Sequence, residues 1–131
     1  MKKILIVTAN YYPEIADKMK TSAINFIKEK YNLHLINSPG VFEIPVIISK
    51  YIDDFDGVIA LGSVIKGETP HFDFISTATT NAIMQLSIKY KKPIGNGILT
   101  CLNKQQAIAR VNKGVEAARA VDHVLSNEPK K

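Results

Sequence analysis

The sequence predicts an α/β protein, a three-layer αβα sandwich with a four-stranded parallel sheet. Short apolar runs alternate along the chain with segments whose apolar residues recur at helical spacing, which is the pattern of a parallel sheet covered by helices. Residues 57–61 are apolar without interruption. A strand that is buried on both faces requires such a run, because neither face meets water.

Four strands are predicted, and they cover residues 3–9, 33–37, 57–64 and 93–100. The first follows two lysines, as the apolar segment of a signal peptide does. Its apolar run is short, however, and no small-residue cleavage site follows it. We therefore expect a strand at this place, in a cytoplasmic protein.

The first two predicted helices lie between the first three strands. An apolar stripe at helical spacing indicates the first helix and is made of Ile15, Met19, Ala23 and Phe26. Pro13 suits the opening turn of this helix. The second helix is expected over residues 43–51, with Pro45 in its first turn.

The third helix has the most regular pattern and is expected to begin near Pro70. Its apolar stripe is made of Phe72, Ile75, Thr79, Ala82, Leu86 and Tyr90. After the fourth strand, two apolar stripes that are out of phase predict a helical segment with a kink or break at residues 112–114. The last residues, 126–131, are expected to be disordered.

Length and composition exclude several classes of protein. A chain of 131 residues is long enough for one domain with a core and too short for two, so we expect a single domain over residues 1–131. No apolar run approaches the roughly 20 residues of a membrane span, which predicts a soluble protein without membrane contact. Cys101 is the only cysteine, which excludes an internal disulfide and a cysteine-rich metal site. We expect a buried, inert thiol.

The net charge of +5 favours an anionic small molecule over a nucleic acid as the partner. Only two of the 17 basic residues are arginines, Arg110 and Arg119, and the lysines are spread along the whole chain. Nucleic-acid-binding proteins more often gather arginine and lysine on one face among aromatic residues. A positive balance without such a cluster suits a small anionic substrate.

His71 is the main candidate for proton transfer. It follows the third predicted strand and a glycine-containing loop, and it stands at the start of the third helix. An imidazole gives and takes protons near neutral pH. A packing or surface role is the alternative for His71. The other histidines are expected to be a structural strand residue, His34, and a surface residue, His123.

Two segments are candidates for binding an anion. Residues 67–69 offer backbone N–H groups and a hydroxyl at the positive end of a helix dipole, although glycines near strand ends are also common turn residues. No P-loop or Gly-x-Gly-x-x-Gly pattern occurs. Arg110 is the second candidate, since a guanidinium binds phosphate through two hydrogen bonds. A solvated arginine at a helix end is the equally weighted alternative.

Two further loops carry candidate binding groups. Tyr11 and Tyr12 follow the first strand, and their rings either stack on a planar heterocycle or pack against the protein. Glu43, in the Pro-Gly-Val-Phe-Glu-Ile-Pro run of residues 39–45, either accepts hydrogen bonds from ligand hydroxyls or favours the start of a helix. Because the carboxyl ends of parallel strands lie at one edge of a sheet, we expect all four loops to open there.

Three segments together resemble the lumazine synthase family. They are residues 39–45, residues 62–74 and the Asn-Lys-Gly-Val-Glu-Ala-Ala run of residues 112–118. The resemblance covers nearly the whole chain and implies a flavodoxin-like fold. It also implies a transferase of riboflavin biosynthesis that joins 5-amino-6-(ribitylamino)uracil to 3,4-dihydroxy-2-butanone 4-phosphate without a cofactor or metal. The products are 6,7-dimethyl-8-ribityllumazine, phosphate and water.

Carried over position by position, the resemblance implies a role for each site residue. Tyr11 stacks on the pyrimidine, Glu43 receives the ribityl hydroxyls, and His71 is the general acid and base. The other contacts to the ribitylaminouracil are Val41, Phe42, Ser63, Val64 and Ile65. The backbone at Glu68 and Thr69 binds the phosphate of the second substrate. The basic side chains of Arg110 and Lys113 add positive charge around it.

Three positions depart from the family pattern. Asn96 stands where phenylalanine is common, so stacking from that side is expected to be weaker. Lys66 replaces the more usual arginine, which keeps the charge and loses the planar fork. Only two residues separate Arg110 from Lys113, where many relatives have a longer connection that contains glycine. The last helix is therefore expected to sit differently.

The resemblance further implies a homopentamer or an assembly of pentamers, and we favour the pentamer. Each active site is then shared: Tyr11, Glu43 and His71 come from one subunit, and Asn96 and Arg110 come from the next. Two alternatives stay open from the sequence. One is a non-catalytic flavin- or lumazine-binding module, and the other is a structural shell protein whose loops only stabilise contacts.

Overall fold

The centre of the fold is a four-stranded parallel sheet. A computed structural model describes residues 1–68 and 70–130 of the chain. The strands are β1 (Lys3–Ala9), β2 (Asn32–Ser38), β3 (Gly57–Ile65) and β4 (Ile94–Cys101). They pair in the order β2-β1-β3-β4, and every pair is parallel. All four predicted strands are confirmed, and each of their ends lies within one residue of the predicted position.

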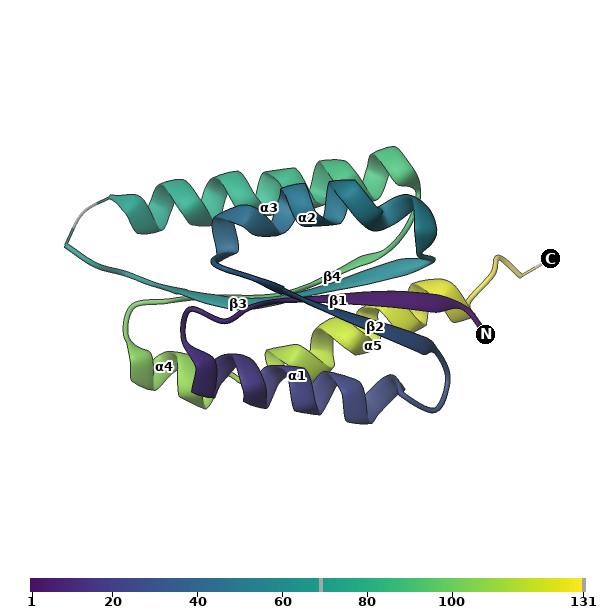
Figure 1. Cartoon of the computed structure of the whole chain (residues 1–131), viewed down its shortest axis with the longest axis horizontal. Coiled ribbons are helices and arrows are strands. Elements are labelled where there is room, and N and C mark those ends of the chain that lie inside the picture. The colour runs from purple at the N-terminus through teal and green to yellow at the C-terminus, as the bar shows by residue number, and fades with distance from the viewer. Residues whose placement is uncertain (69, 131) are drawn as a thin grey trace.

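Helices cover both faces of this sheet. They are α1 (Pro13–Ile27), α2 (Ile44–Tyr51), α3 (His71–Tyr90), α4 (Lys104–Ala109) and α5 (Lys113–Ser126). Figure 1 shows α2 and α3 on one face and α1, α4 and α5 on the other, which confirms the predicted sandwich. Among the described residues, none of the helices has both the length and the apolar character needed to cross a membrane.

The inner strand β3 contributes side chains to both layers of the core. Ile59 and Leu61 pack into the cluster beneath α1 and α5, whereas Val58 and Ala60 pack into the cluster beneath α2 and α3. All four side chains are completely buried. Burying an aliphatic side chain of this size contributes about 1.5–3 kcal/mol. The uninterrupted apolar run of the sequence thus serves two cores at once.

The predicted apolar face of α1 needs one correction. Phe26 is 38% exposed, and the buried position belongs to Ile27, which continues the four-residue spacing from Ile15. The Phe26 ring instead lies under the guanidinium of Arg119 on α5, at 5.2 Å from its centroid. The ring therefore packs at the α1–α5 surface and not in the core.

The predicted break at residues 112–114 is confirmed, because α4 ends at Ala109 and α5 begins at Lys113. Gly114 lies so close to the carbonyl of Met19 on α1 that a Cβ would overlap the backbone. Gly95 on β4 lies in the same way against the carbonyl of Ala117 on α5. Helix α5 is therefore held at backbone contact with both α1 and the sheet.

Asp122 connects α5 to the turn between α1 and β2. Its carboxylate accepts hydrogen bonds from Tyr31 Oη (2.7 Å), Lys30 Nζ (3.1 Å) and Ser126 Oγ (3.0 Å). The bond from Tyr31 is the main cause that lowers the pKa of Asp122, and burial is the main cause that raises the pKa of Tyr31. Ser126, which the sequence places in a disordered tail, is the last residue of α5. Lys131 lies outside the described residues.

This cluster predicts a pH-dependent contribution to stability. Because the pKa of Asp122 in the folded state lies below its ordinary value of 3.8, the ionised carboxylate stabilises the fold at pH values above that value. We expect Asp122→Asn to lower the free energy of unfolding by about 1–2 kcal/mol at pH 7. The deficit should shrink as the pH falls below 3.8 and through the lower pKa of the folded state.

Urea unfolding followed by circular dichroism, at neutral pH and near pH 3, measures this difference. Asp53→Asn is the matched control, because the exposed Asp53 carboxylate forms no hydrogen bond or ion pair with other described residues. A deficit of equal size at both pH values would contradict the role of the ionised carboxylate.

Candidate functional site

The loops that follow β1, β2 and β3 leave the sheet at its carboxyl edge (Figure 1). A pocket of about 700 Å³ opens at this edge. It is lined by Tyr11, Tyr12, Pro39, Gly40, Val41, Phe42, Glu43, Ser63, Val64, Ile65, Gly67, His71, Phe72 and Ile75. We call it the histidine pocket. Ligands of open α/β sheets bind at this edge, and pockets of this size suit small organic molecules.

Gly62 allows the walls of the histidine pocket to approach one another. A Cβ at this position would lie 2.9 Å from Ala9 Cβ and 3.0 Å from Val41 Cγ2, closer than side chains pack. Ser38 Oγ donates a hydrogen bond to the carbonyl of Gly40 at 2.6 Å, which tightens the turn before Val41. The loops after β1, β2 and β3 are thereby brought around one cavity.

Phe42 and Glu43 lie in a 3-10 turn (Val41–Glu43) that leads directly into α2. Pro45 occupies the first turn of α2, as predicted, where a missing N–H costs nothing. Phe42 is 60% exposed at the rim of the pocket, and Glu43 is half-buried in its wall. Within residues 1–68 and 70–130, no ion pair engages the Glu43 carboxylate. It is therefore available to accept hydrogen bonds from a ligand.

Tyr11 and Tyr12 form an edge-to-face aromatic pair at the mouth of the pocket. Their ring centroids are 5.0 Å apart, with an interplanar angle of 78°. Tyr11 is 73% exposed, whereas Tyr12 is half-buried and packs against the core beneath α1. The sequence marks both tyrosines as candidates for stacking, whereas the resemblance assigns the stacking to Tyr11 alone.

His71 is the first residue of α3 and directly follows Pro70, which confirms the predicted start of this helix. Its exposed imidazole lines the histidine pocket together with Phe72 and Ile75. The apolar stripe of α3 predicts only a core role for these two residues, and the structure gives them both roles. Because α3 has 20 residues, the positive end of its dipole favours an anion beside the imidazole.

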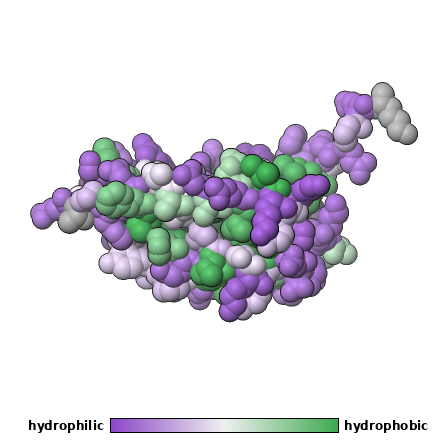
Figure 2. Space-filling view, turned by 90° about the horizontal axis from the view of Figure 1, so that it is seen from above, coloured by the Kyte–Doolittle hydropathy of each residue, from purple (hydrophilic) through white to green (hydrophobic). Residues whose placement is uncertain are grey.

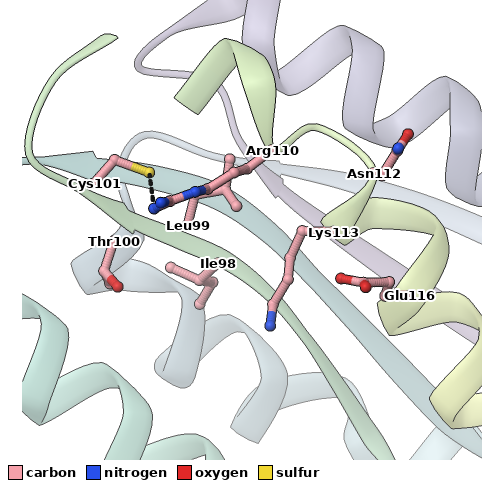
Figure 3. A pocket seen from close by; sticks show the side chains of 8 residues that line it. All are labelled: Ile98, Leu99, Thr100, Cys101, Arg110, Asn112, Lys113 and Glu116. Atoms are coloured by element: carbon pink, nitrogen blue, oxygen red, sulfur yellow. Dashed lines mark hydrogen bonds between the residues drawn. The ribbon is translucent and has the colours of Figure 1, made fainter. Parts of the chain in front are cut away.

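Arg110 and Lys113 lie in a different pocket. This cavity of about 350 Å³ opens beside β4, α4 and α5, and we call it the arginine pocket (Figure 3). It is lined by Ile98, Leu99, Thr100, Cys101, Arg110, Asn112, Lys113 and Glu116. No residue lines both pockets. Cys101 is buried, as predicted, and its sulfur accepts a hydrogen bond from Nη1 of Arg110 at 4.0 Å.

Two of the remaining predicted site residues, Glu68 and Asn96, line neither pocket. Asn96 is exposed on the edge strand β4, and its Oδ1 accepts a hydrogen bond from the backbone N–H of Ile98 at 3.0 Å. Glu68 is exposed in the loop between β3 and α3. Thr69 lies outside the described residues. Among the residues described, His, Cys, Asp and Glu side chains nowhere gather in threes as metal ligands do.

This arrangement defines an α/β protein whose candidate ligand site lies at the carboxyl edge of a parallel sheet, with an imidazole at the start of a long helix. Residues 1–128 match the family described as 6,7-dimethyl-8-ribityllumazine synthase. The chain belongs to this family, as its three motif segments predict.

Curated relatives agree with this assignment, and each of the following three is named 6,7-dimethyl-8-ribityllumazine synthase. The protein from Agrobacterium fabrum is 42% identical, over 89% of this chain and 88% of the relative. The protein from Campylobacter curvus is 39% identical, over 95% and 87%. The protein from Bdellovibrio bacteriovorus is 38% identical, over 94% and 73%. The similarity therefore spans most of both chains in every case.

Proposed function

We propose that the protein is a transferase that condenses 5-amino-6-(ribitylamino)uracil with 3,4-dihydroxy-2-butanone 4-phosphate to give 6,7-dimethyl-8-ribityllumazine, phosphate and water. The observation that carries the proposal is the shared lining of the histidine pocket. In a chain of this family, Tyr11, Glu43 and His71 reach one cavity of about 700 Å³ from three different loops. An aromatic ring, a carboxylate and an imidazole suit a heterocycle that carries hydroxyl groups and must exchange protons.

Each group has a defined task in this proposal. Tyr11 stacks on the pyrimidine, and the Glu43 carboxylate accepts hydrogen bonds from the ribityl chain. The other walls of this subsite are Val41, Phe42, Ser63, Val64 and Ile65. His71 transfers protons during imine formation and phosphate elimination, since both steps need a group that gives and takes protons. Holding two substrates together supplies much of the acceleration.

Fixed positive charge stabilises the phosphate before and after it leaves. Arg110 and Lys113 provide this charge in the proposal, and the backbone at Glu68 and Thr69 adds N–H donors near the start of α3. Arg110 contacts no carboxylate within the described residues, so its charge is available to an anion. Proton transfer and phosphate binding are thus assigned to separate parts of the fold.

We propose that a second copy of the chain brings these two parts together. The histidine and arginine pockets share no residue, whereas the reaction needs the imidazole and the phosphate-binding arginine at one substrate pair. Arg110 and Asn96 of one subunit would therefore complete the histidine pocket of the next. This arrangement makes the isolated subunit inactive, and a closed ring of five is the assembly that the resemblance implies.

The outer side of α3 supports such an assembly. Phe74, Met84 and Ile88 are 67%, 58% and 68% exposed, and the residues between them on this side, Thr77 and Asn81, are uncharged. Figure 2, which views the molecule from above the α2–α3 layer, shows apolar surface gathered on this face. Phe42 and Val46, which are 60% and 59% exposed, extend it toward α2. Several large apolar side chains exposed on one face favour a protein interface there.

We further propose that residues 1–131 act as one domain, since all four strands belong to one sheet. We propose the cytoplasm as the location, because the lone cysteine, Cys101, excludes an internal disulfide. Fractionation of cells that contain the tagged protein tests the location.

The proposed activity predicts that the purified protein accelerates formation of the lumazine from its two substrates. The spontaneous condensation, measured by the same absorbance change without protein, is the reference. No acceleration over this reference would refute the proposal. Tight binding of a flavin without turnover would instead favour a non-catalytic binding module.

Two substitutions separate the roles of the basic groups. We expect Arg110→Ala to lower kcat/KM for the butanone phosphate by about 10- to 100-fold, because a charged hydrogen-bonding partner is lost. We expect His71→Ala to lower kcat by a smaller factor, about tenfold, because proximity remains. Steady-state kinetics with each substrate varied in turn measures both effects.

The chain offers a matched control for each of these variants. Arg119→Ala removes the other arginine, which lies against Phe26 on the α1–α5 surface. His123→Ala removes an exposed histidine near the end of α5. Both control variants should keep the kinetics of the unchanged protein. Equal activity of all four variants would contradict the assigned roles.

Mixed assemblies test whether the site is shared. Arg110→Ala and His71→Ala subunits are unfolded together and refolded, so that they mix at random. If the two residues of a site come from neighbouring copies, about a quarter of the sites then contain both native residues. The mixture should then be more active than either variant alone, and sedimentation should show a pentamer. Activity equal to the mean of the two variants would contradict a shared site.

A further inference from the structure

The Arg110 guanidinium is held by an unusual partner. Its Nη1 donates a hydrogen bond to the sulfur of Cys101 at 4.0 Å (Figure 3). In the part of the chain that the structure describes, no other side chain bonds to this guanidinium and no carboxylate forms an ion pair with it. Glu116 lines the same pocket but lies beyond ion-pair distance.

The side chain of Cys101 is held in the core. Cys101 is the last residue of β4, is 1% exposed and belongs to the core cluster beneath α1 and α5. Its carbonyl accepts a hydrogen bond from the N–H of Lys66 at 2.9 Å, so the backbone is held at the end of the sheet as well. A side chain buried in this way keeps one position, so the contact that it offers to the guanidinium is in a fixed place.

The helix that carries Arg110 is also fixed at its start. Asn103 Oδ1 accepts a hydrogen bond from the N–H of Gln106 at 2.9 Å, and Gln106 Oε1 accepts one from the N–H of Leu102 at 2.8 Å. The first bond caps α4, and the second ties the residue before the cap to the same turn. Arg110 follows the last residue of α4, and its N–H donates to the carbonyl of Ala107 at 3.1 Å. Only the long, exposed side chain of Arg110 remains to be oriented.

We propose that Cys101 is a positioning residue for Arg110, and this inference rests on the phosphate-binding role proposed for that arginine. The thiol is a neutral and weak acceptor. It restricts the rotamers of Arg110 without neutralising the guanidinium or competing with a phosphate for it. A carboxylate at the same place would also orient the arginine, but it would cancel the charge that the phosphate needs.

Two substitutions of the sulfur test the proposal. Cys101→Val removes the acceptor and keeps an apolar side chain of similar size, whereas Cys101→Ser keeps a neutral acceptor. Neither change affects the backbone bond between Cys101 and Lys66. We expect Cys101→Val to raise the KM for the butanone phosphate about three- to tenfold, the value of one hydrogen bond, with kcat and the KM for the ribitylaminouracil unchanged. Cys101→Ser should restore the KM to within about twofold.

The decisive comparison repeats Cys101→Val in the Arg110→Ala background. If the sulfur acts through Arg110, the second change has no further effect on the KM. An equal rise in that background, or a rise in the KM of both substrates, would show a general structural role and would overturn the proposal. An unchanged KM in Cys101→Val alone would overturn it too. Circular dichroism establishes that each variant is folded before the kinetics are compared.

A failure of the proposed enzymatic function is a separate result. It would appear as an absence of acceleration by the unchanged protein, before any variant is considered. In that case the same variants are compared by titration with inorganic phosphate. The positioning role then predicts weaker phosphate binding for Cys101→Val and recovery for Cys101→Ser, and equal affinities for all variants would overturn it.

Discussion

The parallel pairing of β3 with β1 on one side and β4 on the other is the constraint on which the candidate site depends. Because these strands run in the same direction, the loops that follow them leave the sheet at the same edge. Side chains of β3 enter both core clusters, so the strand is anchored from two faces. A shift of one residue would turn every side chain to the wrong face, and the loop to His71 therefore starts from a determined place.

Close contacts at glycine residues fix the positions of the helices relative to the sheet. Gly95 and Gly114 leave no room for a Cβ between α5 and its neighbours. Gly62 on β3 lies similarly close to the side chains of Ala9 and Val41 beside the histidine pocket. At such positions the absence of a side chain sets the distance between two elements. The glycine contacts of α5 therefore determine its position, and with it the position of the α4–α5 turn that carries Arg110.

Charged side chains differ in their polar partners between the Asp122 cluster and the candidate site. Asp122 receives three hydrogen bonds, and this satisfied cluster joins α5 to the rest of the fold. Arg110 has one neutral partner, and Glu43 has no ion pair among the described residues. An unpaired charge keeps its capacity to bind a ligand, whereas a satisfied one stabilises the native state.

The sequence by itself determined the strands, the helices, the break between α4 and α5 and the placement of His71 at a helix start. These features depend on local apolar spacing and on glycine and proline positions, which a linear pattern contains. Motif segments near Glu43 and His71 also determined the family. Phe26 escaped this kind of inference, because either of two adjacent residues, Phe26 or Ile27, continues a helical stripe.

Only the tertiary structure decided which candidate residues share a cavity. Tyr12 and Phe72 joined the histidine pocket, while Arg110 was placed apart from His71, beside Cys101. Distances between loops depend on the strand order β2-β1-β3-β4 and on how closely α5 approaches the sheet. The spacing of residues along one segment predicts neither the strand order nor the approach of α5, because both arise from contacts between segments that are far apart in the chain.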